Sequence, residues 1–384
     1  MILATYSSKH TIKKGKKIFL NFIKSLVALS LLFIPAAVAV IYANKFADWL
    51  YTPLNEILKS ALNVIDSWPS LFASLMGGNY GLVAMFPFLI LYAIPTIVIF
   101  SITIEIYKST GLIDRISITL QPFLSLIGLG SRDLVRVIMG FGCNVPAIVS
   151  SRSCNSCSRG TCVSAISFGS ACSYQMSSTL AVFAAAGMAS LGLIYVLILT
   201  ATTLIYLRFT TPKVLRTATS QLEQLPSNPL SFPSWKAVWR ETLNTLKQFV
   251  VMAFPIFVII CFFAALLDWL NILNWSSNIL APILAVFNLP GDAASALVLG
   301  AVRKDGIAIG LIENGGAGLK TSLITPVQVM TAVYLAGVLL PCLVTVSTVV
   351  REISWKFATR LCVRQVIWAS GFGMIVAWGG ALIS

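Results

Sequence analysis

Residues 140–147 read GFGCNVPA, a string that does not fit an uninterrupted helix. Gly140 and Gly142 weaken a helix through their backbone freedom, and Pro146 lacks the N–H group that a helix interior requires. The surrounding sequence is apolar. Irregular backbone at membrane depth is tolerated only where it is buried in protein or lines a cavity, so the string predicts a broken segment on a polar path. Its free carbonyls could bind a cation, with the Cys143 thiolate and the Asn144 side-chain carbonyl as further ligands.

The whole chain has the composition of a membrane protein. Of its 384 residues, 57% are hydrophobic and 10% are charged, whereas soluble domains are about 25% charged. The net charge of +14 indicates cationic cytoplasmic loops rather than a nucleic-acid surface. The one histidine, His10, stands in a basic tail. A histidine metal site or a hydrolase triad is therefore not predicted, and we expect a protein that is not an enzyme.

The predicted fold is all-α and polytopic, with about seven spans and two half-penetrating broken segments. Residues 1–17 form a basic cytoplasmic tail, and residues 18–384 form the membrane domain. This domain divides into a first half at about 82–208, a linker at 209–247 and a second half at about 248–384. We expect a multi-pass protein of the cell inner (cytoplasmic) membrane with a cytoplasmic N-terminus.

An internal repeat relates the two halves. A shift of 160 residues places Pro95 on Pro255, Pro122 on Pro282, and Gly140 on Gly300. The segment 107–136 carries four Lys or Arg residues and its counterpart 267–296 carries none, so the positive-inside rule puts them on opposite sides of the membrane. The halves are therefore predicted to have inverted topology. In transporters, that arrangement places the substrate site near the midplane, between discontinuous helices.

These motifs resemble the ferrous iron transport protein B (FeoB) family, whose membrane domain is a Gate-type permease. The string GCNVPA is similar to its first Gate motif, and Ala171-Cys172-Ser173 is similar to a second cysteine element downstream. In the second half, Lys304-Asp305 resembles a basic–acidic pair, and Pro341-Cys342 begins a P-C-x-x-T-V element. The similarity covers roughly residues 20–384.

The resemblance implies a permease that imports ferrous iron or a similar divalent metal through a cysteine-lined path between two Gate halves. Its candidate metal ligands are Cys143, Asn144, Cys172, Cys342 and Asp305. Sulfur ligands suit Fe²⁺ or another late divalent metal better than Mg²⁺ or Ca²⁺, and they must be deprotonated, so uptake should weaken at low pH. The metal is cargo, and no resident cofactor is expected. The expected partners are the divalent ion and the lipid bilayer, and not nucleic acid.

Secondary candidates surround this set. They are Glu105, Ser173, Gln175, Lys304, Cys154, Cys157 and Cys162. The three last cysteines have the spacing C-x₂-C-x₄-C, which the family pattern lacks, and they either hold a metal at the cytoplasmic mouth of the path or are idle thiols. Every cysteine has the alternative role of a small packing residue, and Asp305 has the alternative of an ion pair with Lys304 or Arg303.

The sequence leaves the coupling to GTP, the oligomeric state and the transported solute open. FeoB members normally carry an N-terminal GTPase domain, which these residues do not include, so either a separate GTPase acts in trans or transport is not coupled to GTP. The string GGAGLKT at 315–321 lacks the G-K-[ST] junction of a phosphate loop, and no nucleotide site is expected. The oligomeric state is also open, and a homo-oligomer is one of the possibilities. The alternative functions are a nucleoside or other small-solute permease and a non-transporting membrane scaffold.

Overall fold

The computed structural model describes residues 56–78, 81–83, 94–154, 158–188, 190–216, 231–248, 250–251, 254–270, 279–304, 306–311, 319 and 325–382, together with scattered residues between 27 and 54. The predicted tail 1–17 lies outside the described residues, as do residues 18–43 at the start of the predicted membrane domain, apart from Val27 and Tyr42. The regular secondary structure of the described residues is helical, as the sequence predicted.

The helices are of the α and the short 3-10 (η) kind. Up to residue 248 they are α2 (Ser70–Gly77), α4 (Ile94–Ser109), α5 (Leu112–Leu124), η2 (Ser125–Ile127), α6 (Ser131–Gly142), α7 (Asn144–Ser150), η3 (Ser151–Ser153), α8 (Arg159–Gly169), α9 (Ser173–Ala185), α10 (Leu191–Thr210) and α12 (Trp235–Gln248). From residue 254 they are α13 (Phe254–Trp269), η5 (Ala285–Phe287), η6 (Gly291–Ala293), α15 (Ala294–Val302), α16 (Gly306–Leu311), α17 (Pro326–Val338), α18 (Leu343–Glu352) and α19 (Trp355–Ala381).

Three helical segments among the described residues are long and apolar enough to cross a membrane. They are Leu191–Thr210, Pro326–Glu352 and Trp355–Ala381. The second comprises α17 and α18 and is interrupted between them at residues 339–342. A bilayer core needs about 20 apolar residues in a helix, so these segments establish a membrane protein.

The shift of 160 residues also relates helix boundaries. α4 and α13 begin and end at matching positions, and so do η2 and η5. Both 3-10 helices end in a left-handed residue, Gly128 with φ 72° and Asn288 with φ 55°. The next amide in each case donates to the carbonyl five residues back, at 3.1 Å, which closes a Schellman motif. The two segments therefore adopt the same local structure from different sequences.

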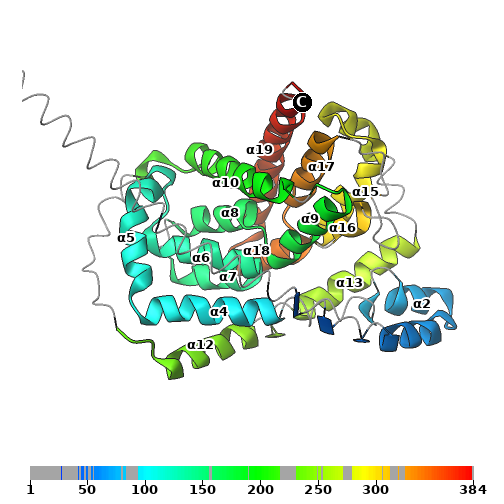
Figure 1. Cartoon of the computed structure of the whole chain (residues 1–384), viewed down its shortest axis with the longest axis horizontal. Helices are drawn as coiled ribbons and strands as arrows, with labels where there is room; N and C mark the ends of the chain where they lie inside the picture. The colour runs from blue at the N-terminus through cyan, green and yellow to red at the C-terminus, as the bar shows by residue number, and fades with distance from the viewer. Residues whose placement is uncertain are drawn as a thin grey trace, which may run out of the picture.

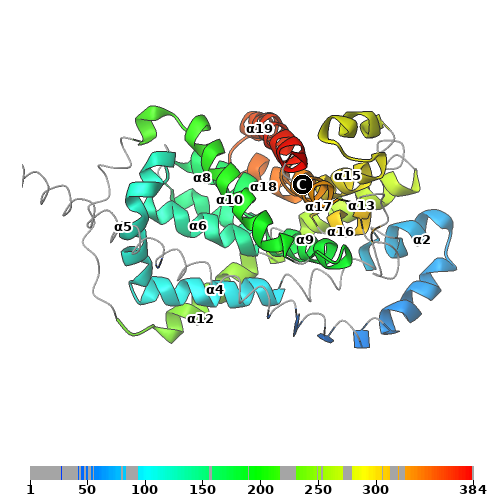
Figure 2. The same cartoon turned by 45° about the horizontal axis from the view of Figure 1, so that its top comes forward.

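The two halves meet around α17, α18 and α19. Figures 1 and 2 place α5, α6 and α8 on one side of these helices and α13 and α15 on the other. α18 packs against both α7 and α13, and α17 packs against α9, α10 and α15. One buried apolar cluster runs through both halves, from Ile116 to Phe372. The core is therefore shared between the halves, and it holds their broken helices against one another.

The predicted linker 209–247 includes a helix. α12 packs along α4, as Figure 1 shows, and the backbone amide of Ser231 donates to the carbonyl of Thr110 at 3.3 Å. Part of the linker is thereby attached to the first half.

Candidate functional site

The first helix break lies at Cys143. α6 ends at Gly142 and α7 begins at Asn144, while Cys143 between them is extended, with φ -154° and ψ 134°. Pro146 stands in the first turn of α7, where its missing N–H leaves no hydrogen bond unmade. The break thus has the local cause that the sequence indicated.

Asn144 presents an unusual atom at this break. The residue is 6% exposed, and its side-chain oxygen Oδ1 has no hydrogen-bond partner among the described residues. An unpaired buried carbonyl costs about 1–3 kcal/mol, so it is rarely left without a role. An amide oxygen is also a ligand for a cation. Asn144 therefore has a free, buried oxygen at the start of α7.

The second break lies at Arg303 and Lys304. α15 ends at Val302, and Arg303 is extended, with φ -147° and ψ 143°, at the position related to Cys143 by the 160-residue shift. Lys304 is 5% exposed. Its ammonium nitrogen Nζ donates to the carbonyls of Ala336, Gly337 and Leu340 at 3.2, 2.8 and 2.7 Å.

These three hydrogen bonds indicate that Lys304 caps the end of a helix. The last carbonyls of a helix have no partner within it, and a cation near them is stabilised by the helix dipole. An ammonium has three donors. Two of them bond to the last turn of α17, at Ala336 and Gly337, and the third bonds to Leu340, two residues past its end. Lys304 thus caps the broken end of α17, from which Pro341 and Cys342 continue.

The third break presents Cys342. This residue is the N-cap of α18, and its Sγ lies 3.1 Å from the hydroxyl oxygen of Thr345 in a hydrogen bond. Because α18 packs against α7, the helices that begin beside Cys342 and Cys143 are neighbours.

The breaks bring the predicted residues together. Cys143 is close enough to Cys172 and Cys342 for their charges to interact, and Lys304 interacts in the same way with Cys172 and Cys342. Gln175 also lies here, because its side-chain nitrogen would be 2.6 Å from a Cβ added at Gly337, beside the Lys304 bonds. The same nitrogen donates to the Tyr195 hydroxyl at 2.8 Å.

Comparison with known proteins identifies the architecture that carries these breaks. Residues 90–206 and 250–356 match the Gate family, described as nucleoside recognition. The chain belongs to this family. The two matched segments start at the same 160-residue shift that relates Pro95 to Pro255.

The relatives of this Gate chain include proteins named "Fe(2+) transporter FeoB". The one from Methanocaldococcus jannaschii is 24% identical over 386 residues, which cover 88% of this chain and 54% of the relative. The one from Legionella pneumophila is 30% identical over 194 residues, which cover 48% of this chain and 25% of the relative. The chain thus spans about half the length of the first relative. No solved structure matches it. The predicted resemblance is confirmed: this is an FeoB-like membrane domain.

Some of the predicted site residues lie away from the helix breaks. Others lie outside the residues that the structure describes. Glu105 forms an ion pair with Lys108 at the end of α4. Asp305, Cys157 and the side chain of Ser173 lie outside the described residues, as do residues 315–321 except Leu319. Cys154 and Cys162 lie in another cluster, with Asp133. Within the described part of the chain, that cluster is the one set of three metal-ligating residues whose atoms all lie within 4.8 Å of one another.

Sequence reasoning missed one joint between the halves. The carboxylate of Glu352, whose side chain is 2% exposed, accepts two hydrogen bonds of 2.6 Å from Arg152 and approaches Arg159 at 3.5 Å. The hydrogen bond to Glu352 raises the pKa of Arg152. The partners are about two hundred positions apart in sequence, so no local pattern could have indicated the pair.

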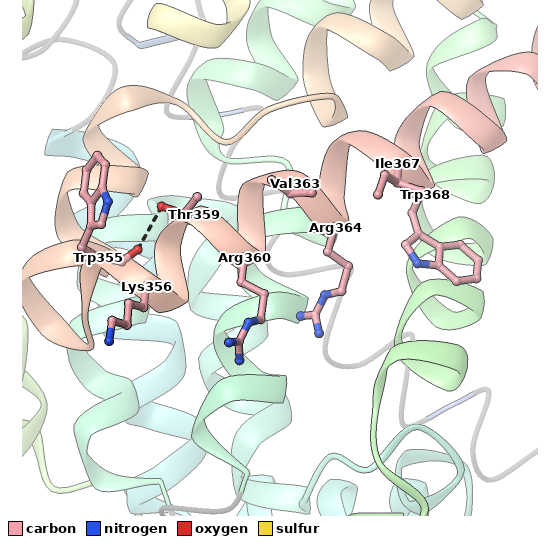
Figure 3. Close-up of a pocket in the computed structure, with 8 residues that line it drawn as sticks. All are labelled: Trp355, Lys356, Thr359, Arg360, Val363, Arg364, Ile367 and Trp368. Carbon is pink, nitrogen blue, oxygen red and sulfur yellow. Dashed lines mark hydrogen bonds between the residues drawn. The ribbon is translucent and has the colours of Figure 1, made fainter.

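A groove of about 590 Å³ runs along one face of α19. Lys356, Arg360 and Arg364 extend to the same side of the helix in Figure 3, with Trp355 and Trp368 at the two ends of this row of side chains. Arg364 donates to the Tyr206 hydroxyl at 3.0 Å and to the Ser164 hydroxyl at 2.6 Å. Basic side chains flanked by tryptophan are typical of the cytoplasmic membrane interface.

Proposed function

We propose that this protein is a permease that imports ferrous iron or a similar divalent metal through a cysteine-lined path between two inverted Gate repeats. The observation that carries the proposal is the break at Cys143, where the buried Asn144 Oδ1, without a hydrogen-bond partner among the described residues, adjoins a thiol that lies in the neighbourhood of Cys172 and Cys342. Sulfur combined with amide oxygen suits Fe²⁺ and later divalent metals. The printed names of the FeoB relatives support the same cargo.

The path would be assembled from both halves. Cys143 and Asn144 bind the ion from the first broken segment, while Cys172 and Cys342 provide further sulfur. Asp305 balances the charge of the ion from the second broken segment. Lys304 holds the end of α17 and so fixes the direction in which Cys342 enters the path.

The inverted arrangement and the orientation belong to the same proposal. Matching helix boundaries at a shift of 160 residues support a repeat. The cationic segment 107–136 and its counterpart 267–296, which has no Lys or Arg, support opposite orientations of the two halves. The basic face of α19 supports placing that end in the cytoplasm. We place the protein in the inner membrane with its N-terminus inside, and a separate GTPase in trans would supply any GTP coupling.

Replacement of Cys143 by Ser tests the metal path. In intact cells that lack other ferrous uptake, we expect Cys143→Ser to reduce radioactive iron uptake at least about tenfold, because a hydroxyl is a poor ligand for a borderline metal. Cys362→Ser is the matched control, since Cys362 is a half-buried thiol on α19 outside the path. Asn144→Ala should also reduce uptake. Parental uptake by Cys143→Ser, at equal amounts in the membrane, would remove Cys143 from the path.

A nucleoside permease is the second candidate, favoured by the description of the matched family as nucleoside recognition. Flux into liposomes that contain the purified protein separates the candidates. Flux of Fe²⁺ alone supports the metal permease, and flux of uridine alone would replace it with the second candidate. A protein that transports neither would instead be a scaffold.

A further inference from the structure

A second group of metal-ligating side chains lies away from the helix breaks. Asp133 stands in the first turn of α6, Cys154 directly follows η3, and Cys162 is on α8. One ligand atom from each lies within 4.8 Å of the other two. Cys162 is fully buried, Asp133 is 4% exposed, and Cys154 is half-buried. Three elements thus converge on one small volume.

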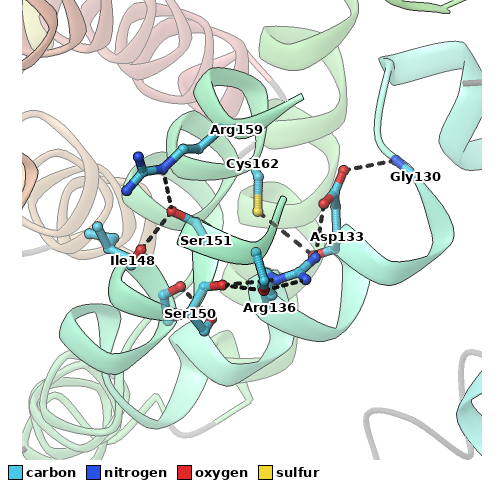
Figure 4. A network of polar contacts seen from close by, with 10 residues as sticks. Gly130, Asp133, Arg136, Ile148, Ser150, Ser151, Arg159 and Cys162 are labelled. Atoms are coloured by element: carbon cyan, nitrogen blue, oxygen red, sulfur yellow. Dashed lines mark hydrogen bonds and ion pairs between the residues drawn. The ribbon is translucent and has the colours of Figure 1, made fainter. Parts of the chain in front are cut away.

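Neighbouring groups hold the Asp133 carboxylate in place. Its Oδ2 accepts the backbone N–H of Gly130 at 3.2 Å, and its Oδ1 accepts Arg136 at 3.1 Å. Arg136 is itself fixed by bonds to the carbonyl of Ser150 at 3.2 Å and the hydroxyl of Ser153 at 2.8 Å (Figure 4). A carboxylate has about four acceptor positions, so these two bonds leave it able to bind a metal. Such supporting hydrogen bonds are typical of ligating carboxylates.

We propose that Asp133, Cys154 and Cys162 bind a late divalent metal such as Zn²⁺ or Fe²⁺. Two thiolates and one carboxylate carry three negative charges, which the metal and the Arg136 guanidinium together neutralise. Thiolates select borderline and soft metals over Mg²⁺ or Ca²⁺. Tetrahedral Zn–S bonds of about 2.3 Å put two sulfurs about 3.8 Å apart, so the cluster needs to contract by no more than about 1 Å.

Three protein ligands leave one tetrahedral position for water or an exchanging ligand, as in open metal sites. The bound metal would join α6, the segment after η3 and α8. Arg152 and Arg159 flank that segment and bind Glu352 of the second half. Metal occupancy would therefore stabilise the segment through which the two halves are joined.

This site is distinct from the proposed transport path. Asp133 stands in the first turn of α6 and Cys143 directly follows its last residue, so ten residues separate them, or about 15 Å at the helical rise of 1.5 Å per residue. Cys154 follows the far end of α7, away from Cys143, and Arg136 on α6 bonds to the last residue of that helix. The site is thus at the other end of the α6–α7 pair, and metal binding there does not depend on whether the protein transports iron.

Cobalt titration tests the proposal in the full-length protein. The parent is the purified, reduced variant with Cys143, Cys172 and Cys342 all changed to Ser, so that the path thiols are absent. We expect it to bind one equivalent of Co²⁺ with a thiolate-to-cobalt absorption band. Cys154→Ser and Cys162→Ser in this parent should each lose the band, and Cys362→Ser should keep it.

Asp133→Asn keeps an oxygen that can accept the Gly130 bond, and so preserves the start of α6. It should weaken Co²⁺ binding at least roughly tenfold while the band persists at saturation. Absence of the band in the parent, or its persistence in Cys154→Ser, would overturn the proposal. Loss of the band in Cys157→Ser together with its retention in Cys154→Ser would also overturn it, by replacing a proposed ligand.

Discussion

Gly300 gives a sharp test of how closely the second broken segment packs. A Cβ added at Gly300 would lie 2.9 Å from the carbonyl oxygen of Ala336 and 3.1 Å from a side-chain carbon of Ile307. The first of these is backbone, so α15 and α17 must separate by about 0.5 Å to restore ordinary contact. The same Ala336 carbonyl accepts Lys304, and the separation therefore loosens the cap on α17.

The expected cost follows from two opposing effects. Overpacking costs about 1–3 kcal/mol, while replacing a helical glycine by alanine contributes about 0.5–1 kcal/mol of stability. Gly300→Ala should therefore lose up to about 2.5 kcal/mol in net stability. Gly371 on α19 is the matched control, because a Cβ there meets nothing within 4 Å. Gly371→Ala should gain stability through the helix effect alone.

Thermal unfolding of the purified variants in one detergent measures both effects. We expect the midpoint of Gly300→Ala to fall below that of the parent and the midpoint of Gly371→Ala to equal or exceed it. A Gly300→Ala midpoint at or above the control would refute the close approach of α15 to α17.

Three further variants test the Glu352 ion pairs, the buried Gln365 hydrogen bond and the orientation of α19. Glu352→Gln removes the carboxylate that Arg152 and Arg159 share, so it should lower the unfolding midpoint, and an unchanged midpoint would show that the joint carries no stability. Gln365→Leu leaves the Val338 carbonyl without its 2.7 Å donor in the core and should cost about 1–3 kcal/mol in the same assay, so a cost near zero would contradict the buried bond. Arg360→Cys in the Cys362→Ser background should react with a membrane-impermeant thiol reagent from the cytoplasmic side, whereas labelling from outside would reverse the orientation proposed for α19.

The first two helix breaks were the part of the site that sequence could predict, whereas the third, between α17 and α18, falls within a stretch that the sequence predicted as one span at about 326–350. Glycine and proline act on the backbone within one or two turns, so GFGCNVPA sufficed to indicate a break at Cys143. The family was also accessible, because its motifs are short strings around these breaks. The second break was predicted from the repeat, since its own sequence, VRKDG, holds one glycine and no proline.

The role of Lys304 shows where that reasoning stopped. From sequence, its evident partner was the adjacent Asp305. In the structure its ammonium bonds three carbonyls that are 32 to 36 positions away. Asp133 was missed for a similar reason. In the sequence it has the position of an acidic residue in the first turn of a helix, and only folding brings it beside Cys154 and Cys162.

Sequence by itself determined that this chain is a helical membrane protein, which of its glycines and prolines match at a shift of 160 residues, and where its first helix breaks. These properties depend on composition and on neighbours a few residues apart. Tertiary structure decided which thiols and carboxylates share a volume and which carbonyls Lys304 caps. Hydrogen bonds and metal ligation act over about 3 Å in space, and residues as distant in sequence as Arg152 and Glu352 reach that distance only when the two halves pack together.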